Sequence, residues 1–388
     1  MATSIWDVAT EGASAFDIYG NASMSDIELS YEDRTAIGLA TESDTGFVDY
    51  INDCQMSLMQ NASMTFAQES VAAIQVAHGT SYSTAMEGLK TIISDAWEAI
   101  KKFLAKVWAT IKEYAKKAKD YFARRASLGK AMLTKYSSVL RNKKIDTSIK
   151  FKWADIDIEG FTKQRASWMQ AYDDPEFRKK IVEVDALFVK LAEVLKNKNL
   201  AQNDRDTLEN NKRQIEKTLA DLENIWKQMS NAYDGATLAN EMDRVLYNNA
   251  TSNGEGLAKY EDRSWNEIQD KVMKWADLDT TRYLNECLGI FEKDSQATLK
   301  LINQTEQNSI KAVEGAESAE IKKYESAIRT YIKQLAQAQA KFHKMYIYRL
   351  KNAISLQQAQ AIAAARKAIL AKGTTSESFT IDNLDFIY

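Results

Sequence analysis

The chain has 388 residues, 45% of them apolar and 27% charged, with a formal net charge of −3 at pH 7. These values are typical of a folded protein that is too long for one small core, and they suggest two or three domains. One proline and 14 glycines are few for this length, and with abundant Ala, Lys, Glu, Gln and Leu they predict long helices. The sequence lacks a run of about 18 apolar residues, so no transmembrane segment is expected.

The two cysteines, Cys54 and Cys287, are too few for a disulfide framework or a zinc site, and we interpret both as buried free thiols. Residues 1–8 lack the basic and apolar regions of a secretory signal. We therefore expect a protein that is made and kept in a cytosol-like compartment.

The first 86 residues are acidic, with twelve Asp and Glu against one Arg, a net charge of −11. Ser, Thr, Gly and Asn are dense up to Gly46, which predicts a loose or only partly helical segment. Between Phe47 and Ala77 the spacing of apolar residues predicts one or two short helices, which the stretch Gly79-Thr80-Ser81 ends.

At Glu87 the charge changes sign, because residues 87–152 contain seventeen Lys and Arg against six acids, a net charge of +11. This block also has the clearest helical periodicity, since its apolar residues recur every three or four positions and share one face. That face comprises Leu89, Ile93, Ala96, Ile100, Phe103, Val107, Ile111, Tyr114, Ala118 and Tyr121. Continued to Leu140, the helix would be roughly 75 Å long.

Residues 145–161 change to a period of two. Their apolar members, alternating with charged residues, are Ile149, Phe151, Trp153, Ile156 and Ile158. This pattern predicts a small hairpin. Residues 379–386 repeat it, so these segments could share one small sheet.

The remainder of the chain is predicted to be helical. Asp174-Pro175-Glu176 is a good helix start, with Asp174 as N-cap and Pro175 at the first helical position. The predicted helices run over 175–197, 204–233, 265–275, 281–313 and 321–372. The first two should form an antiparallel hairpin, and residues 248–256 read as a linker.

These elements predict an all-α fold, a multi-helix bundle with very long helices and a minor β element. We divide the chain into an acidic N-terminal region (1–86), a basic amphipathic helix with a short β-like segment (87–160), a helical hairpin (161–247) and a long-helix C-terminal region (257–388).

Catalytic motifs are not evident in the sequence. His78 and His343 are the only histidines, and neither has neighbours at metal-ligand spacing; we interpret His343 as a partly exposed helix residue. The carboxylates Asp155, Asp157 and Glu159 are interpreted as a solvated acidic face. We therefore expect a protein that is not an enzyme, with no metal, no cofactor and no small-molecule substrate.

The basic helix is the one feature of the sequence that suggests a function, and four interpretations of it compete. It could pack on the acidic region, neutralise nucleic-acid phosphates, lie on an anionic membrane, or simply expose lysines to water. Trp97, Trp108, Tyr114 and Tyr121, interleaved with lysines, suit the second and third interpretations. The candidate phosphate or partner contacts are Lys101, Lys102, Lys106, Lys112, Lys116, Lys117, Lys119, Arg124 and Arg125.

The charge reversal coincides with the sequence Ala85-Met86-Glu87-Gly88. The same pattern, a small residue followed by any residue and Glu, occurs at Ala9-Thr10-Glu11, Ala40-Thr41-Glu42 and Ala67-Gln68-Glu69. An acidic leader with such triplets, followed by a Lys-rich amphipathic helix, resembles the internal capsid proteins of large tailed bacteriophages. In that family a maturation protease cuts after the Glu, and the basic body stays with the packaged DNA.

The resemblance covers the first third of the chain and implies a processing junction between Glu87 and Gly88. It also implies a virion protein that is made in the host cytoplasm and is not secreted. Its partners would be other virion proteins or further copies of itself, with DNA as a possible contact. The alternative function is a cytosolic protein that binds a membrane surface through the basic helix. A competing interpretation of the junction is that Ala85-Met86-Glu87 is only the first turn of the helix, capped by Ser83 or Thr84.

Overall fold

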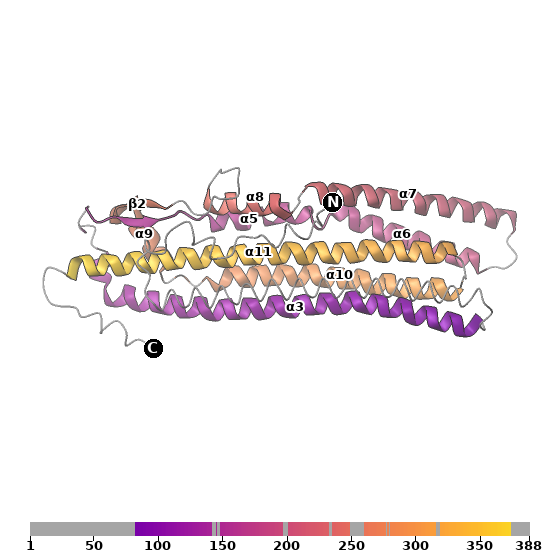
Figure 1. The fold of residues 1–388 in the computed structure, drawn as a ribbon, viewed down its shortest axis with the longest axis horizontal. Helices are drawn as coiled ribbons and strands as arrows, with labels where there is room; N and C mark the ends of the chain where they lie inside the picture. The colour runs from indigo at the N-terminus through magenta and orange to yellow at the C-terminus, as the bar shows by residue number, and fades with distance from the viewer. Residues whose placement is uncertain are drawn as a thin grey trace, which may run out of the picture.

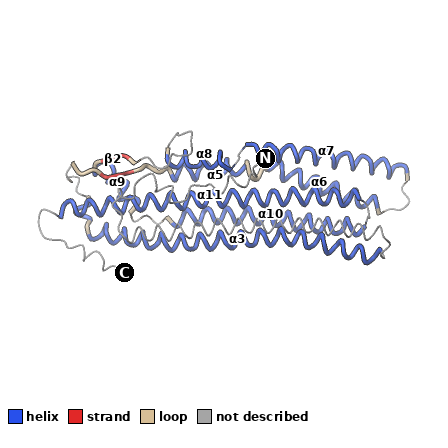
Figure 2. Tube along the Cα trace, in the orientation of Figure 1, coloured by secondary structure: helices blue, strands red, loops and turns tan. Residues whose placement is uncertain are grey.

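The structure is a computed structural model that describes residues 82–141, 145, 148–196, 201–232, 235–248, 260–276, 278, 280–315 and 319–373. Within these ranges the fold is an elongated bundle of nine helices with one two-stranded sheet (Figures 1 and 2). The predicted fold class, all-α with very long helices and a minor β element, is confirmed. Residues 1–81 of the acidic region, residues 249–256 of the predicted linker and the strand-like segment 379–386 lie outside the described residues.

Three long helices run side by side along the bundle (Figure 1). They are α3 (Tyr82–Lys135), α10 (Thr281–Gly315) and α11 (Ala319–Gly373). With 54 and 55 residues, α3 and α11 are each about 80 Å long. The short α4 (Ser137–Leu140) follows α3 after an interruption at Tyr136.

The predicted helical hairpin is confirmed as α6 (Pro175–Leu195) and α7 (Gln202–Ala232), which pack against each other. Its start is as predicted, because Asp174 Oδ1 accepts the backbone N–H groups of Glu176 and Phe177 at 2.7 and 3.2 Å. In Figure 1 this hairpin covers one end of the bundle.

The other end carries the smaller elements (Figure 1). These are β1 (Phe151–Trp153), α5 (Ile158–Gln170), α8 (Gly235–Tyr247), β2 (Glu261–Arg263) and α9 (Trp265–Trp275). The bounds of α9 agree with the prediction. A capping box holds its first turn, because Ser264 N–H donates to the Glu267 carboxylate at 2.6 Å.

The predicted hairpin over 145–161 is wrong. β1 pairs antiparallel with β2, more than a hundred residues later in the chain, in the register Phe151 to Arg263. Residues after Asp157 do not form the second strand, because its side chain accepts the Gly160 N–H at 2.8 Å and so caps α5.

α11 is the centre of the fold. Residues 350–362 are buried all round, and segments from the predicted regions 87–160, 161–247 and 257–388 all contact this helix. A helix in this position is usually apolar on every side. This stretch nevertheless includes six buried polar residues: Lys351, Asn352, Ser355, Gln357, Gln358 and Gln360.

Candidate functional site

The inner face of α3 is apolar and packs on α10 and α11. Its buried members follow the predicted periodicity: Ile93, Ala96, Ile100, Phe103, Val107, Ile111, Tyr114, Ala118 and Phe122. This burial fixes the rotation of the helix about its axis, so the charged positions between these residues must face away from the bundle. The predicted apolar stripe is therefore confirmed from Ile93 to Ala118.

The outer face of α3 carries a row of cations that we call the α3 cationic strip. It consists of Lys102, Lys106, Lys112, Lys116, Lys117, Lys119 and Arg124, which are exposed except for the half-buried Lys119. From Lys102 to Arg124 the strip is about 33 Å long at the helical rise of 1.5 Å per residue. The side chain of Arg125 is not among those described.

Most of the strip has no counter-charge within the described part of the chain. Lys117 pairs with Glu113 at 3.0 Å, and Arg124 Nε donates to the backbone carbonyl of Asp120 at 3.2 Å. Lys112 lies over the Trp108 ring, 4.4 Å from its centroid. The four remaining members make no ion pair with a described residue: Lys102, Lys106, Lys116 and Lys119.

Lys101 was among the candidate contacts, but the structure turns it toward the bundle. Its Nζ lies 2.6 Å from Glu306 of α10 and 2.7 Å from Glu98. Partial burial opposes its charge, but the hydrogen bonds to both carboxylates outweigh this and raise the pKa of Lys101. Lys101 is thus an internal link between α3 and α10, already neutralised.

Of the four aromatic residues of α3 expected among the lysines, Trp97 and Tyr114 face the bundle and not the exposed lysines. Trp97 is fully buried and donates its Nε1–H to Glu325 of α11 at 3.2 Å, and Tyr114 is buried as well. Trp108 stacks on Phe291 of α10 with 4.9 Å between ring centroids. Trp97 and Tyr114 therefore offer no platform for nucleobases or for a membrane interface, and Trp108 is half-buried beneath Lys112. The side chain of Tyr121 is outside the described set.

The junction between Glu87 and Gly88 lies inside α3, in its second turn, because the helix already begins at Tyr82. Ser83 and Thr84 are also inside the helix, so neither is its N-cap. The side chains of residues 81–89 are not among those described.

His343 is buried, which corrects the expectation of partial exposure. It is 1% exposed, with Phe291 at a ring-centroid distance of 4.3 Å. Its Nε2 is 3.5 Å from Asp294 Oδ2, too long for a strong hydrogen bond, and the same carboxylate accepts from Arg165 at 3.0 Å. Burial lowers the pKa of His343 despite Asp294, so the imidazole is neutral and packed among aromatic rings.

The described residues include no group of three or more His, Cys, Asp and Glu side chains that could hold a metal ion. Cys287 is a buried free thiol, as predicted. Among the helices of the described ranges, none is both long and apolar enough to cross a bilayer.

Fold and site together define a class of protein: an elongated helical bundle with a cationic strip along one long helix. Comparison of the chain with protein-family models, curated proteins and solved structures finds no match.

Proposed function

We propose that the protein is a non-enzymatic structural component inside the virion of a large tailed phage. It packs against other virion proteins or further copies of itself, and its α3 cationic strip contacts packaged DNA. The observation that carries this proposal is the strip itself, in which four lysines have no counter-ion among the described residues.

Duplex DNA suits this strip because it carries one negative charge per about 1.7 Å of its axis. A lysine ammonium acts as a compact point charge and does not read base edges in the bidentate way of arginine. Of the aromatic side chains of α3 that are described, Trp108 is half-buried and stacked on Phe291, and the others are buried. Binding should therefore be electrostatic, independent of sequence and sensitive to salt.

The membrane alternative has less support. An interfacial helix must insert its apolar face into the headgroup region, whereas Ile93, Ile100 and Val107 are buried against α10 and α11. Membrane binding through that face would require α3 to leave the bundle. Flotation with anionic vesicles, without retention on DNA, would favour the alternative.

A charge-removal experiment tests the DNA contact. Replacing the unpaired strip lysines with glutamine should weaken binding to duplex DNA, measured across a salt series. The four changes are Lys102→Gln, Lys106→Gln, Lys116→Gln and Lys119→Gln. If all four contact phosphates, the slope of log affinity against log salt should fall by about 3 to 4.

The matched control removes the same charge elsewhere. Its four exposed lysines lie on α5, α6 and α10 and make no ion pair with a described residue: Lys163, Lys190, Lys293 and Lys300. The control should retain the original salt slope. An equal loss of DNA affinity in both variants would mean that only the net charge of the protein matters and not the position of the strip. Unchanged affinity in the strip variant would refute the contact.

The virion location needs a separate measurement. Mass spectrometry of purified phage particles should find this chain at a fixed ratio to the capsid proteins, because a structural component is present in defined copies. Its absence from particles, with abundance in the lysate, would contradict the proposal.

A further inference from the structure

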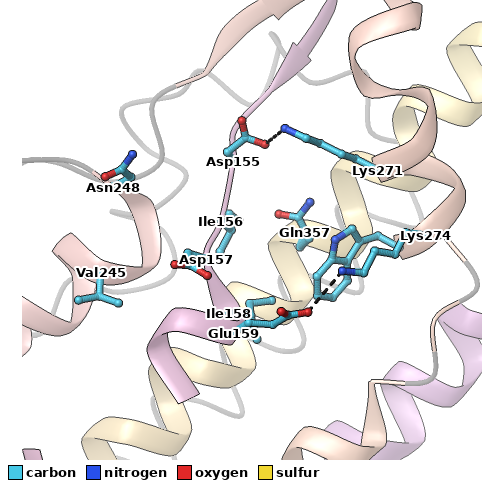
Figure 3. A pocket seen from close by; sticks show the side chains of 11 residues that line it. Asp155, Ile156, Asp157, Ile158, Glu159, Val245, Asn248, Lys271, Lys274 and Gln357 are labelled. Carbon is cyan, nitrogen blue, oxygen red and sulfur yellow. Dashed lines mark hydrogen bonds and ion pairs between the residues drawn. The ribbon is translucent and has the colours of Figure 1, made fainter. Parts of the chain in front are cut away.

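A pocket of about 480 Å³ lies where residues 155–159 leave β1 and enter α5 (Figure 3). Its other walls are Val245 near the C-terminal end of α8, Asn248 just after that helix, and a face of α9 that includes Trp275. A volume of this size is within the range of small-molecule sites. The pocket lies on the side elements of the bundle and shares no residue with the α3 cationic strip.

Two ion pairs line this pocket (Figure 3). Lys271 of α9 pairs with Asp155, and one helical turn later Lys274 Nζ lies 3.4 Å from Glu159 Oε1. All four side chains are about half exposed. An ammonium has three donors and a carboxylate about four acceptor positions, so both pairs keep hydrogen-bonding capacity for a ligand.

Gln357 of α11 supplies a second, independent sign of a ligand. It is 2% exposed and yet lines the pocket, and in Figure 3 its amide lies between the two ion pairs. Its Oε1 accepts from Gln360 at 3.0 Å, whereas its Nε2 donates to no described residue. This amide donor faces the pocket without a described protein acceptor, so a carbonyl oxygen brought in by a ligand would satisfy it.

The charges of the lining select a neutral ligand. Each ammonium is already paired with a carboxylate, so a charged ligand gains little net attraction, whereas a hydroxyl both donates to a carboxylate and accepts from an ammonium. Asp157 is engaged as the N-cap of α5, and the described residues offer no metal-binding group here. Ile156 and Trp275 add apolar surface that suits a methyl group and the C–H face of a ring.

We propose that this pocket binds an N-acetylated sugar. The acetamido carbonyl accepts from Gln357 Nε2, and the acetyl methyl lies on the apolar lining. The ring hydroxyls bridge the Lys271–Asp155 and Lys274–Glu159 pairs. The site goes beyond the structural role proposed above and does not depend on it. The proposal concerns binding alone, and the sugar is not chemically changed in the pocket.

The test is saturation-transfer NMR on the full-length protein with three probes: N-acetylglucosamine, glucosamine and glucose. Saturation should reach N-acetylglucosamine, most strongly its acetyl methyl, and should be much weaker for the other two. A trisaccharide of N-acetylglucosamine, added in parallel, distinguishes a free sugar from the end of a chain. Tighter binding of the trisaccharide indicates a chain end, and equal binding indicates a single sugar.

Variants connect the signal to the pocket. Lys271→Ala with Lys274→Ala removes exposed side chains and should weaken binding about tenfold or more, since each lost hydrogen bond is worth several-fold in affinity. Gln357→Met should abolish the preference for the acetamido group. Lys163→Ala, on the exposed side of α5 outside the pocket, is the matched control and should bind normally.

Three results would overturn the proposal. They are no saturation of any sugar in the wild type, equal saturation of glucose and N-acetylglucosamine, and an undiminished signal in the Lys271 and Lys274 double variant. Both lysines are exposed, so the double variant should fold. Its result therefore tests the proposal even if Gln357→Met does not fold.

Discussion

Two aspartates in the bundle, the buried Asp185 and the partly buried Asp294, show how neighbours decide the cost of a charge. Asp185 of α6 is 2% exposed, and its one hydrogen bond comes from Asn308 at 2.6 Å, which leaves Oδ1 without a partner. Burial therefore raises the pKa of Asp185 to about 6. For Asp294, burial acts in the same direction, but His343 and Arg165 outweigh it and lower the pKa.

Asp185→Asn is expected to stabilise the protein at neutral pH. The unfolded carboxyl ionises near its ordinary pKa, below the folded value, so the folded state loses stability as the pH rises from about 4 to 6. Removing the charge should recover about 1 to 3 kcal/mol at pH 8 and almost nothing at pH 4. Urea unfolding at both pH values measures this difference.

Asp294→Asn is the matched comparison with the opposite sign. Because the pKa of Asp294 is lowered in the folded state, its ionised form stabilises the protein, and that contribution is lost as the pH falls through the folded pKa. The Asp294→Asn variant should be less stable than wild type at pH 8. A neutral or destabilising Asp185→Asn at pH 8 would show that Asn308 compensates the buried charge fully.

At the scale of elements, a side chain from α11 replaces a missing strand. Gln360 accepts the Ala154 N–H at 3.0 Å and donates to the Ala154 carbonyl at 2.7 Å. This is the pairing that a neighbouring strand would make, and it ties the segment between β1 and α5 to the central helix. Gln360 is 2% exposed, so water cannot easily substitute for it.

Gln360→Leu should destabilise the protein by about 2 to 4 kcal/mol, because it leaves a buried backbone N–H and C=O without partners. Gln296→Leu, at an exposed position inside α10, is the control and should stay within about 0.5 kcal/mol of wild type. Chemical unfolding measures both. Similar stabilities for the two variants would mean that the clamp contributes little.

The sequence predicted well those elements whose formation depends on residues close together in the chain. The period of α3, the Asp174 cap of α6 and the bounds of α9 each depend on residues within a few positions of one another. The β1–β2 pairing joins residues more than a hundred positions apart, and no local pattern identifies the partner of a three-residue strand. The Asp157 cap was a local signal that the alternating pattern obscured.

The site residues divide in the same way. Exposure of the strip lysines follows from the apolar period of α3, whereas the inward turn of Lys101 depends on Glu306 of another helix. His343 is flanked in sequence by Phe342 and Lys344, and only the approach of Phe291 from α10 buries it. The pocket at Gln357 is formed by four separate elements, so spacing along the chain could not reveal it.

On the scale of the whole molecule, buried polar links fix the register of very long helices. Apolar stripes alone tolerate a slip by one turn, since similar residues recur along them. Lys101 to Glu306, Trp97 to Glu325 and Arg165 to Asp294 each join two different helices at one position. A slip would leave these groups buried without partners, which is strongly unfavourable. The links therefore select one arrangement of the rod.

The charge of residues 1–86, −11 in total, is expected to weaken DNA binding by the strip, because tethered carboxylates compete with phosphates. A chain beginning at Gly88 carries a net charge of +9. It should bind duplex DNA more tightly than the full chain, with a steeper salt dependence. Replacing the twelve acids of residues 1–86 with Asn and Gln keeps the chain length and removes only the charge. This control should restore most of the DNA affinity. Equal affinities of all three across a salt series would exclude masking.

The last prediction is that the bond between Glu87 and Gly88 is cut in the assembled particle. Three observations meet there: the triplet Ala85-Met86-Glu87, the change from acidic to basic sequence, and a position only two turns into α3. Proteases act on extended chain, and terminal helical turns open at low free energy, whereas the centre of α3 does not. A cut at this bond leaves the buried stripe from Ile93 onward and the whole cationic strip intact.

Peptide mapping of protein from mature particles measures this directly and should find a new N-terminus at Gly88. The same chain produced alone, without other phage proteins, should keep the peptide that spans Met86 to Gly88, because the protease is absent. An abundant spanning peptide in mature particles would instead mean that the triplet is only part of the opening turns of α3. In that case the acidic region would stay attached, and the strip would act in its presence throughout.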